Sequence, residues 1–79
     1  MELTKAIRVR ILELMKINNV KAGRLALMCG LYPSTIRRFL KEENRKIKIE
    51  TITLIAQAFN MSLKEFFDSD IFNEVEVKD

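Results

Sequence analysis

Apolar side chains recur at every third or fourth position near the start of the chain, with charged residues between them. The series is Leu3, Ile7, Ile11 and Leu14. This spacing is typical of an amphipathic helix and predicts one over residues 4–17. Thr4 is suited to cap its start. The pair Asn18-Asn19 is suited to end it, because Asn tolerates the left-handed conformation.

The pattern predicts four more helices, over residues 21–29, 32–40, 49–59 and 63–67. Gly30 breaks the second helix, and Pro33 begins the third at the position where its missing N–H is not needed. Residues 41–48, KEENRKIK, form a charged loop. The fourth helix carries one apolar face, made of Ile52, Ile55, Ala56 and Phe59. Asn60 is suited to follow it in the left-handed conformation.

The start of the last helix has a local signature. Ser62 and Glu65 lie three residues apart, as in a capping box, where each side chain bonds the backbone N–H of the other residue. Met61 and Phe66 occupy the positions of a hydrophobic staple. Beyond this helix, residues 71–77 alternate weakly between apolar and polar and are too short a run to predict a strand.

Length and composition agree with one small all-α domain. The chain has 79 residues, of which 48% are hydrophobic and 32% charged, with two Gly and one Pro. That balance favours a folded, soluble domain over a disordered chain. No run approaches the roughly 18 apolar residues of a membrane span, and the charged N-terminal segment is unlike a signal peptide. We expect a cytoplasmic protein with no membrane partner.

Charge divides the chain into two parts. Residues 1–67 hold 13 Lys and Arg against 6 Asp and Glu, a net of +7, whereas residues 68–79 hold one Lys against five Asp and Glu, a net of −4. We therefore expect a basic domain over residues 1–67 and an acidic C-terminal tail over residues 68–79. A basic domain suits a polyanionic partner, although the same charge also serves solubility.

The chain holds one cysteine and no histidine. A single Cys forms no disulfide within the chain, and the usual zinc-binding spacings are missing. A Ser-His or Cys-His catalytic pair is also excluded. We expect Cys29 to be a core thiol and the acidic pairs (residues 42 and 43, residues 68 and 70) to be solvated. The sequence therefore predicts no enzyme activity, no bound metal and no cofactor.

Residues 22–39 meet the requirements of two helices that cross steeply through a short turn. Ala26 supplies the small side chain needed where the helices cross, and Gly30 supplies the positive φ needed in the turn. Five apolar residues are placed to point inward from the two helices: Leu25, Cys29, Leu31, Ile36 and Phe39. An arbitrary helical hairpin rarely meets all of these conditions together.

The segment LALMCGLYPSTIRRFL resembles the helix-turn-helix of the phage repressor and Cro family, the XRE-type regulators. The segment TITLIAQAFNMSLKEFF resembles that family's fourth and fifth helices, and with the first helix the resemblance covers residues 4–67. It implies a compact five-helix domain of the lambda-repressor-like type. It further implies sequence-specific binding of double-stranded DNA by a transcriptional regulator that acts as a repressor.

The resemblance also implies which residues contact DNA. The family's third helix lies in the major groove, so the expected base contacts are the matching residues Pro33, Ser34, Arg37 and Arg38. Arg38 is the strongest candidate, because a guanidinium donates two hydrogen bonds to guanine. Phosphate contacts are expected from Lys21, Arg24, Tyr32, Thr35, Lys41, Arg45, Lys46 and Lys48. The Lys and Arg side chains among them would neutralise phosphates and release counterions. A merely solvated helix face and loop is the alternative.

Some positions depart from the family pattern. Ala22 stands where a phosphate-binding Gln is common, and Lys21 and Tyr32 stand in place of Ser or Thr caps. Glu42 replaces a Gly after the third helix, and Ile47 replaces a Pro before the fourth. One phosphate contact of the family is therefore missing, and the loop is expected to turn less tightly.

A further departure replaces an Arg–Glu ion pair of the family by Met15 and Leu40. Replacing both partners of a buried ion pair by packed apolar groups is tolerated, whereas replacing one is costly. We therefore expect the side chains of Met15 and Leu40 to touch.

One such domain contacts a half-site, so a homodimer on a palindromic operator is expected. The predicted dimer contact is the fifth helix with the C-terminal segment, where the apolar residues are Phe66, Phe67, Ile71 and Phe72. The alternative is that these residues close the monomer's own core. A second hypothesis for the function is a protein-interaction module, adaptor or antitoxin-like, that keeps the fold without specific DNA binding. A steep fall of DNA affinity with salt separates the two.

Overall fold

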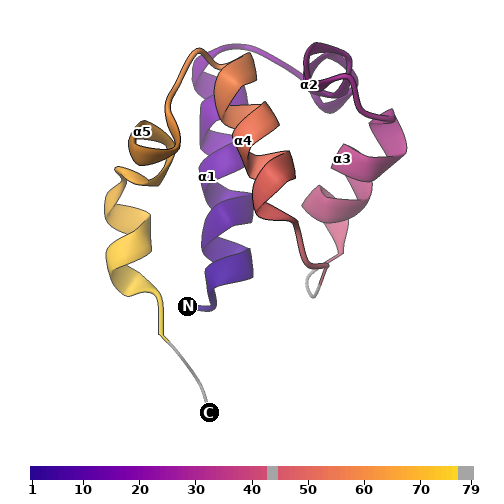
Figure 1. Cartoon of the computed structure of the whole chain (residues 1–79). Coiled ribbons are helices and arrows are strands. Elements are labelled where there is room, and N and C mark those ends of the chain that lie inside the picture. The colour runs from indigo at the N-terminus through magenta and orange to yellow at the C-terminus, as the bar shows by residue number, and fades with distance from the viewer. Residues whose placement is uncertain (43–44, 77–79) are drawn as a thin grey trace.

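The computed structural model describes residues 1–42 and 45–76 and is all-helical over them, with no strand (Figure 1). The elements are α1 (Leu3–Ile17), α2 (Ala22–Cys29), α3 (Pro33–Lys41), α4 (Ile49–Ala58), α5 (Leu63–Phe67) and the 3-10 helix η1 (Asp70–Glu74). The predicted all-α, five-helix fold is confirmed. The weakly alternating segment after α5, in which no strand was predicted, forms η1 over its first residues.

The predicted connections between helices have the expected backbone conformations. Gly30, Asn19 and Asn60 are left-handed, with φ of 69°, 54° and 58°. Pro33 is the first residue of α3, as predicted. The predicted cap of α1 is wrong: Glu2 is the N-cap, and Thr4 lies inside the helix. The helix begins earlier because the N–H of Ala6 already reaches the carbonyl of Glu2 at 3.0 Å.

The capping box of α5 is confirmed. The backbone N–H of Glu65 donates to Ser62 Oγ at 3.1 Å, and the backbone N–H of Ser62 donates to Glu65 Oε1 at 3.0 Å. Phe66 is fully buried and Met61 packs against the core. Because α5 has five residues, which is far too short to be stable alone, these end contacts and the packing of Phe66 hold it in place.

The core takes buried apolar side chains from all five α-helices. Its members are Ile7, Ile11, Leu14, Leu25, Ala26, Cys29, Ile36, Phe39, Ile52, Ile55, Ala56 and Phe66. Ala26 is completely buried, as expected for the small residue where α2 and α3 cross. Cys29 is buried as predicted, and its burial raises the pKa of the thiol. The core therefore fixes α3 against α2 and leaves the opposite side of α3 exposed.

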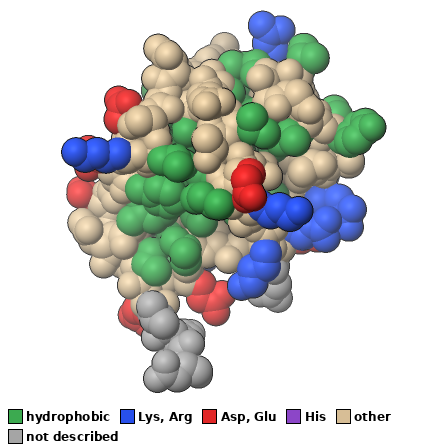
Figure 2. Space-filling model, in the orientation of Figure 1, with side chains coloured by type: hydrophobic (Ala, Val, Ile, Leu, Met, Phe, Trp, Pro, Cys, Tyr) green, Lys and Arg blue, Asp and Glu red, His purple; other side chains and the backbone are tan. Residues whose placement is uncertain are grey.

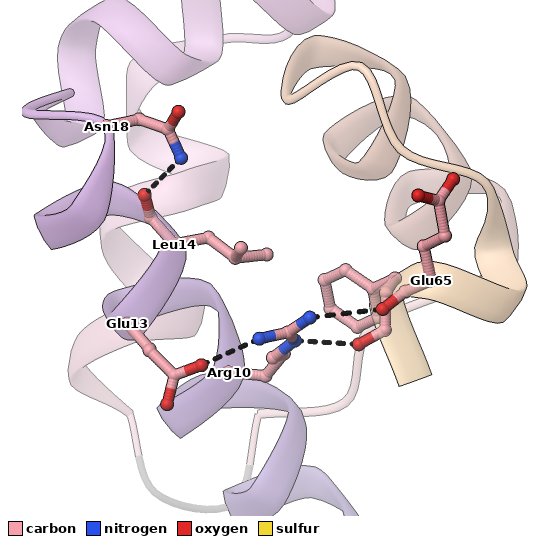
Figure 3. Close-up of polar contacts among 6 residues, drawn as sticks. Arg10, Glu13, Leu14, Asn18 and Glu65 are labelled. Carbon is pink, nitrogen blue, oxygen red and sulfur yellow. Dashed lines mark hydrogen bonds and ion pairs between the residues drawn. The ribbon is translucent and has the colours of Figure 1, made fainter. Parts of the chain in front are cut away.

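Arg10 is a buried charged residue that joins α1 to α5 (Figure 3). Its Nε donates to the carbonyl of Phe66 at 2.7 Å, and its Nη2 donates to the carbonyl of Glu65 at 3.0 Å. Its Nη1 forms an ion pair with Glu13 at 2.6 Å. The guanidinium thus supplies donors to the carbonyls at the C-terminal end of α5, where the Glu65 carbonyl also accepts from the N–H of Asp68 at 3.2 Å.

The chain after α5 packs back onto α1 and the N-terminus. The Phe72 ring lies 4.9 Å from that of Phe67 and 6.4 Å from that of Phe66, measured between centroids. The N-terminal ammonium of Met1 donates to the carbonyl of Glu74 at 3.0 Å, and the N–H of Glu76 donates to the carbonyl of Met1 at 2.9 Å. The aromatic cluster therefore packs against the core of the monomer, with Phe66 buried and Phe67 and Phe72 partly exposed.

Replacing Arg10 by Ala is expected to lower the free energy of unfolding by about 2–4 kcal/mol, because the buried carbonyl of Phe66 and the partly buried carbonyl of Glu65 lose a charged donor. Arg10→Lys should recover only part of this, since an ammonium has no planar fork. The measurement is urea unfolding. The control is Lys5→Ala, which removes an exposed charge from the same helix and should change stability by about 0.5 kcal/mol or less. Equal losses in the Arg10 and Lys5 variants would contradict this role.

Acid is expected to weaken the capping box. The hydrogen bond from the backbone N–H of Ser62, and then that with its side chain, lowers the pKa of Glu65 below its ordinary value. The ionised carboxylate is therefore more favourable in the folded state. The resulting stability is present above the ordinary pKa and is lost as pH falls through the folded one.

Glu65→Gln should accordingly be less stable than the unchanged protein at neutral pH, and this difference should shrink as the pH falls through the lowered pKa of Glu65. Urea unfolding midpoints at several pH values give this difference. A gap between the two proteins that does not depend on pH would show that the charge of Glu65 is irrelevant.

Candidate nucleic-acid interface

Helix α3 presents a polar, positively charged face on the side opposite the core. Ile36 and Phe39 are buried, whereas four residues at helical spacing are exposed: Ser34, Arg37, Arg38 and Lys41. Three of these four carry a positive charge. Figure 2 shows Lys and Arg side chains gathered over α3 and the segment that follows it, away from the apolar area near α5.

The N-terminal end of α3 is open to solvent. Tyr32 is the N-cap and is 80% exposed, and Pro33 is exposed beside it. Within the described residues no side chain caps the start of α2 or of α3. In α3, Pro33 has no N–H and the N–H of Thr35 donates to the carbonyl of Tyr32 at 3.0 Å, so the start of α2 is the more open of the two to an outside anion. Lys21 and Arg24, both exposed, lie at the start of α2.

Arg37 lies across the start of α2. A Cβ built on Gly23 would come within 3.3 Å of Arg37 Nη2. The guanidinium is therefore beside the helix start where the family's phosphate-binding Gln is missing and Ala22 stands instead. Sequence reasoning missed this proximity, because Gly23 and Arg37 belong to different helices and nothing local relates them.

Arg38 is half-exposed and lies beside an acidic group. Its Nε is 3.6 Å from Glu42 Oε1, and Glu42 Oε2 is 3.4 Å from Arg45 Nη1. The predicted base-contacting arginine is thus joined through one carboxylate to a predicted phosphate-contacting arginine. Glu42 stands in the place of the family's Gly, and its φ of −90° and ψ of 110° are extended. The turn needs no left-handed residue, which explains why Gly is dispensable there.

Arg8 of α1 holds the end of α3 in place. Its Nε donates to the carbonyl of Phe39 at 3.1 Å and its Nη2 to the carbonyl of Glu42 at 3.0 Å. Its guanidinium lies 5.7 Å from the centroid of the Phe39 ring. These carbonyls at the end of α3 thereby gain a charged donor. The position of Arg8 among the charged residues of α1 carried no signal of this contact.

The loop before α4 brings several predicted phosphate contacts together. Thr35 and Phe39 of α3 line a groove of about 270 Å³ with residues of the loop and of α4. Those residues are Arg45, Lys46, Ile47, Lys48 and Thr51. Basic groups thus lie on two sides of the exposed face of α3. Lys21 and Arg24 lie at the start of α2, which Arg37 of α3 reaches, and the basic loop residues lie before α4.

Other residues singled out in the sequence lie away from this surface. Met15 and Leu40 both pack against the core cluster, and a direct contact between them stays a prediction. Over residues 1–42 and 45–76, no group of three His, Cys, Asp or Glu is placed to hold a metal ion. No helix in the same residues is long and apolar enough to cross a membrane.

Comparison with known proteins gives two matches to this arrangement. The family model described as the Cro/C1-type HTH DNA-binding domain matches residues 10–70. The crystal structure of the prophage Lp1 protein 11 is similar, with a TM-score of 0.79 and 26% sequence identity, over 95% of this chain and 100% of that one. No curated protein matches the chain.

Gly23→Ala is expected to have two separate effects, a gain in stability and a displacement of the Arg37 side chain. Alanine should stabilise the start of α2 by about 0.5–1 kcal/mol, because Gly23 has no positive φ and Gly is the poorer helix former. Its methyl group should push the flexible Arg37 guanidinium away from the helix. Urea unfolding measures the first effect, and an NMR contact between the introduced methyl group and the Arg37 side chain measures the second. A destabilised variant would mean that Arg37 cannot yield.

Proposed function

Because the chain belongs to the Cro/C1-type helix-turn-helix DNA-binding domain family, we propose that it is a repressor that inserts α3 into the major groove of a specific operator as a dimer. Family membership establishes a DNA-binding transcription regulator. The similar solved structure is a prophage protein, and the repressor role is proposed from the resemblance of the chain to phage repressors.

The observation that carries the proposal is the exposed face of α3. Arg37 and Arg38 lie opposite the buried Ile36 and Phe39, so the core holds the helix while two guanidiniums remain outside. Arg38 is proposed to donate two hydrogen bonds to O6 and N7 of a guanine. Ser34 is proposed to contact a base edge, and Pro33 a thymine methyl group. Arg37, beside the start of α2, is proposed to contact either a base or a phosphate.

The residues around this face are proposed to bind the sugar-phosphate backbone. One group lies at the start of α2, with Lys21 and Arg24, and the other at the end of α3 and in the loop after it, with Lys41, Arg45, Lys46 and Lys48. Tyr32 and Thr35 lie at the start of α3 itself. Two groups on either side of a recognition helix suit the two strands that border a major groove. Each Lys or Arg that neutralises a phosphate adds to the salt dependence of binding.

The dimer is proposed to form through α5 and the segment after it, on a palindromic operator. Although Phe66 is buried in the monomer, Leu63, Phe67, Ile71 and Phe72 are only partly buried. Figure 2 shows a continuous apolar area beside α4, on the side of α5 and η1. A second copy placed there would keep both α3 faces free for DNA.

The test is selection of genomic fragments by the purified protein, followed by titration of an enriched duplex at two salt concentrations. We expect an enriched palindrome bound by two chains, with affinity that falls steeply as salt rises. Arg38→Ala should weaken operator binding by about 1–3 kcal/mol and relax the preference at one base pair. Lys16→Ala, which removes an exposed charge from α1 outside the proposed DNA and dimer surfaces, is the control and should keep that preference.

No enrichment, with weak binding that is equal on all DNA, would contradict the proposal. It would favour the second hypothesis, a protein-interaction module that keeps the fold without specific DNA binding.

A further inference from the structure

We propose that Glu42 sets the sequence discrimination of the α3 surface by opposing contacts of Arg38 and Arg45 with arbitrary backbone phosphates. This inference rests on the proposed DNA-binding function. It concerns Glu42, an acidic residue beside two arginines of that surface, at a position where the family commonly has a glycine with no side chain.

The backbone of Glu42 is held at three points. Its N–H donates to the carbonyl of Arg38 at 2.9 Å. Its own carbonyl accepts from Arg8 Nη2 at 3.0 Å and from the N–H of Arg45 at 3.1 Å. The carboxylate therefore projects from a fixed position between the end of α3 and the basic loop, rather than from a chain free to turn away.

Each oxygen of this carboxylate faces a different arginine. Oε1 lies 3.6 Å from Arg38 Nε and Oε2 lies 3.4 Å from Arg45 Nη1. All three side chains are about half exposed, at 55% for Arg38, 49% for Glu42 and 42% for Arg45. Exposed pairs at these distances add little to folding stability. The arrangement thus has its main effect on what the arginines bind.

The carboxylate acts differently on two ways of binding DNA. Non-specific binding depends on phosphate contacts, and a fixed negative charge near them repels the backbone. In a guanine contact, Arg38 can use Nη1 and Nη2 toward the base while its Nε stays beside Glu42. Specificity is the difference in binding free energy between the operator and other DNA. A group that weakens non-specific phosphate contacts more than the guanine contact therefore increases specificity.

The experiment compares Glu42→Gln with Glu50→Gln on three duplexes. Glu50 is an exposed glutamate in the first turn of α4, so its variant removes the same charge without touching Arg38. The duplexes are the enriched operator, the operator with the guanine assigned to Arg38 replaced, and an unrelated sequence. Dissociation constants are measured at two salt concentrations, and the urea unfolding midpoint confirms that both variants fold.

We expect Glu42→Gln to tighten binding to the unrelated duplex roughly fivefold, the effect of one unit charge at about 4 Å in water. Operator affinity should rise much less, so the ratio between the two should fall about threefold or more. Discrimination against the replaced guanine should fall with it. Glu50→Gln should change all three affinities by a similar factor.

Equal gains on all three duplexes for Glu42→Gln would overturn the inference and leave Glu42 as a general negative charge. A higher ratio in that variant would overturn it as well. If the unchanged protein shows no preference for any duplex, the proposed function itself fails, and the inference fails with it. These outcomes are distinguishable because the unchanged protein is measured on every duplex.

Discussion

The guanidinium of Arg10 is the contact on which the rest of the domain depends. A small chain buries a modest core, and α5 is too short to hold its own conformation. Arg10 supplies charged donors to the carbonyls of Glu65 and Phe66, at the end where α5 has no internal partners (Figure 3). This keeps Phe66 in the core, and Phe66 in turn carries the aromatic contacts that bring back the C-terminal segment.

Two arginines of α1 donate hydrogen bonds to carbonyls at the C-terminal ends of two other helices. Arg10 binds carbonyls at the end of α5, and Arg8, two residues earlier, binds carbonyls at and just beyond the end of α3. Neighbouring residues of one helix point in different directions, so a single helix reaches both sides of the domain. The orientation of the proposed recognition helix is therefore tied to the first helix as well as to α2, against which it packs.

The exposed surface of α3 combines positive charge with one placed negative charge. Arg37 lies over Gly23, at the start of α2, and Arg38 lies beside Glu42. Neither arginine is an isolated charge on a solvated helix, because each has a defined neighbour on another part of the surface. A basic face of this kind attracts DNA in general, whereas the carboxylate of Glu42 is the group proposed to bear on which DNA the face retains.

The sequence by itself determined the features that depend on residues close together in the chain. Hydrophobic spacing located the five helices, Gly30, Asn19 and Asn60 marked left-handed turns, and Ser62 with Glu65 specified a cap. The resemblance to the phage repressor and Cro family supplied the exposed residues of α3. Only the tertiary structure decided the roles of Arg10 and Arg8, the contact of Gly23 with Arg37, and the packing of η1. Arg10 and Phe66 are 56 positions apart, so no local pattern reports their contact. Arg10 lies three residues after Ile7 and four before Leu14, at the border of the apolar face of α1. A charged residue at such a border can be exposed or buried, and the packing of α5 decides which.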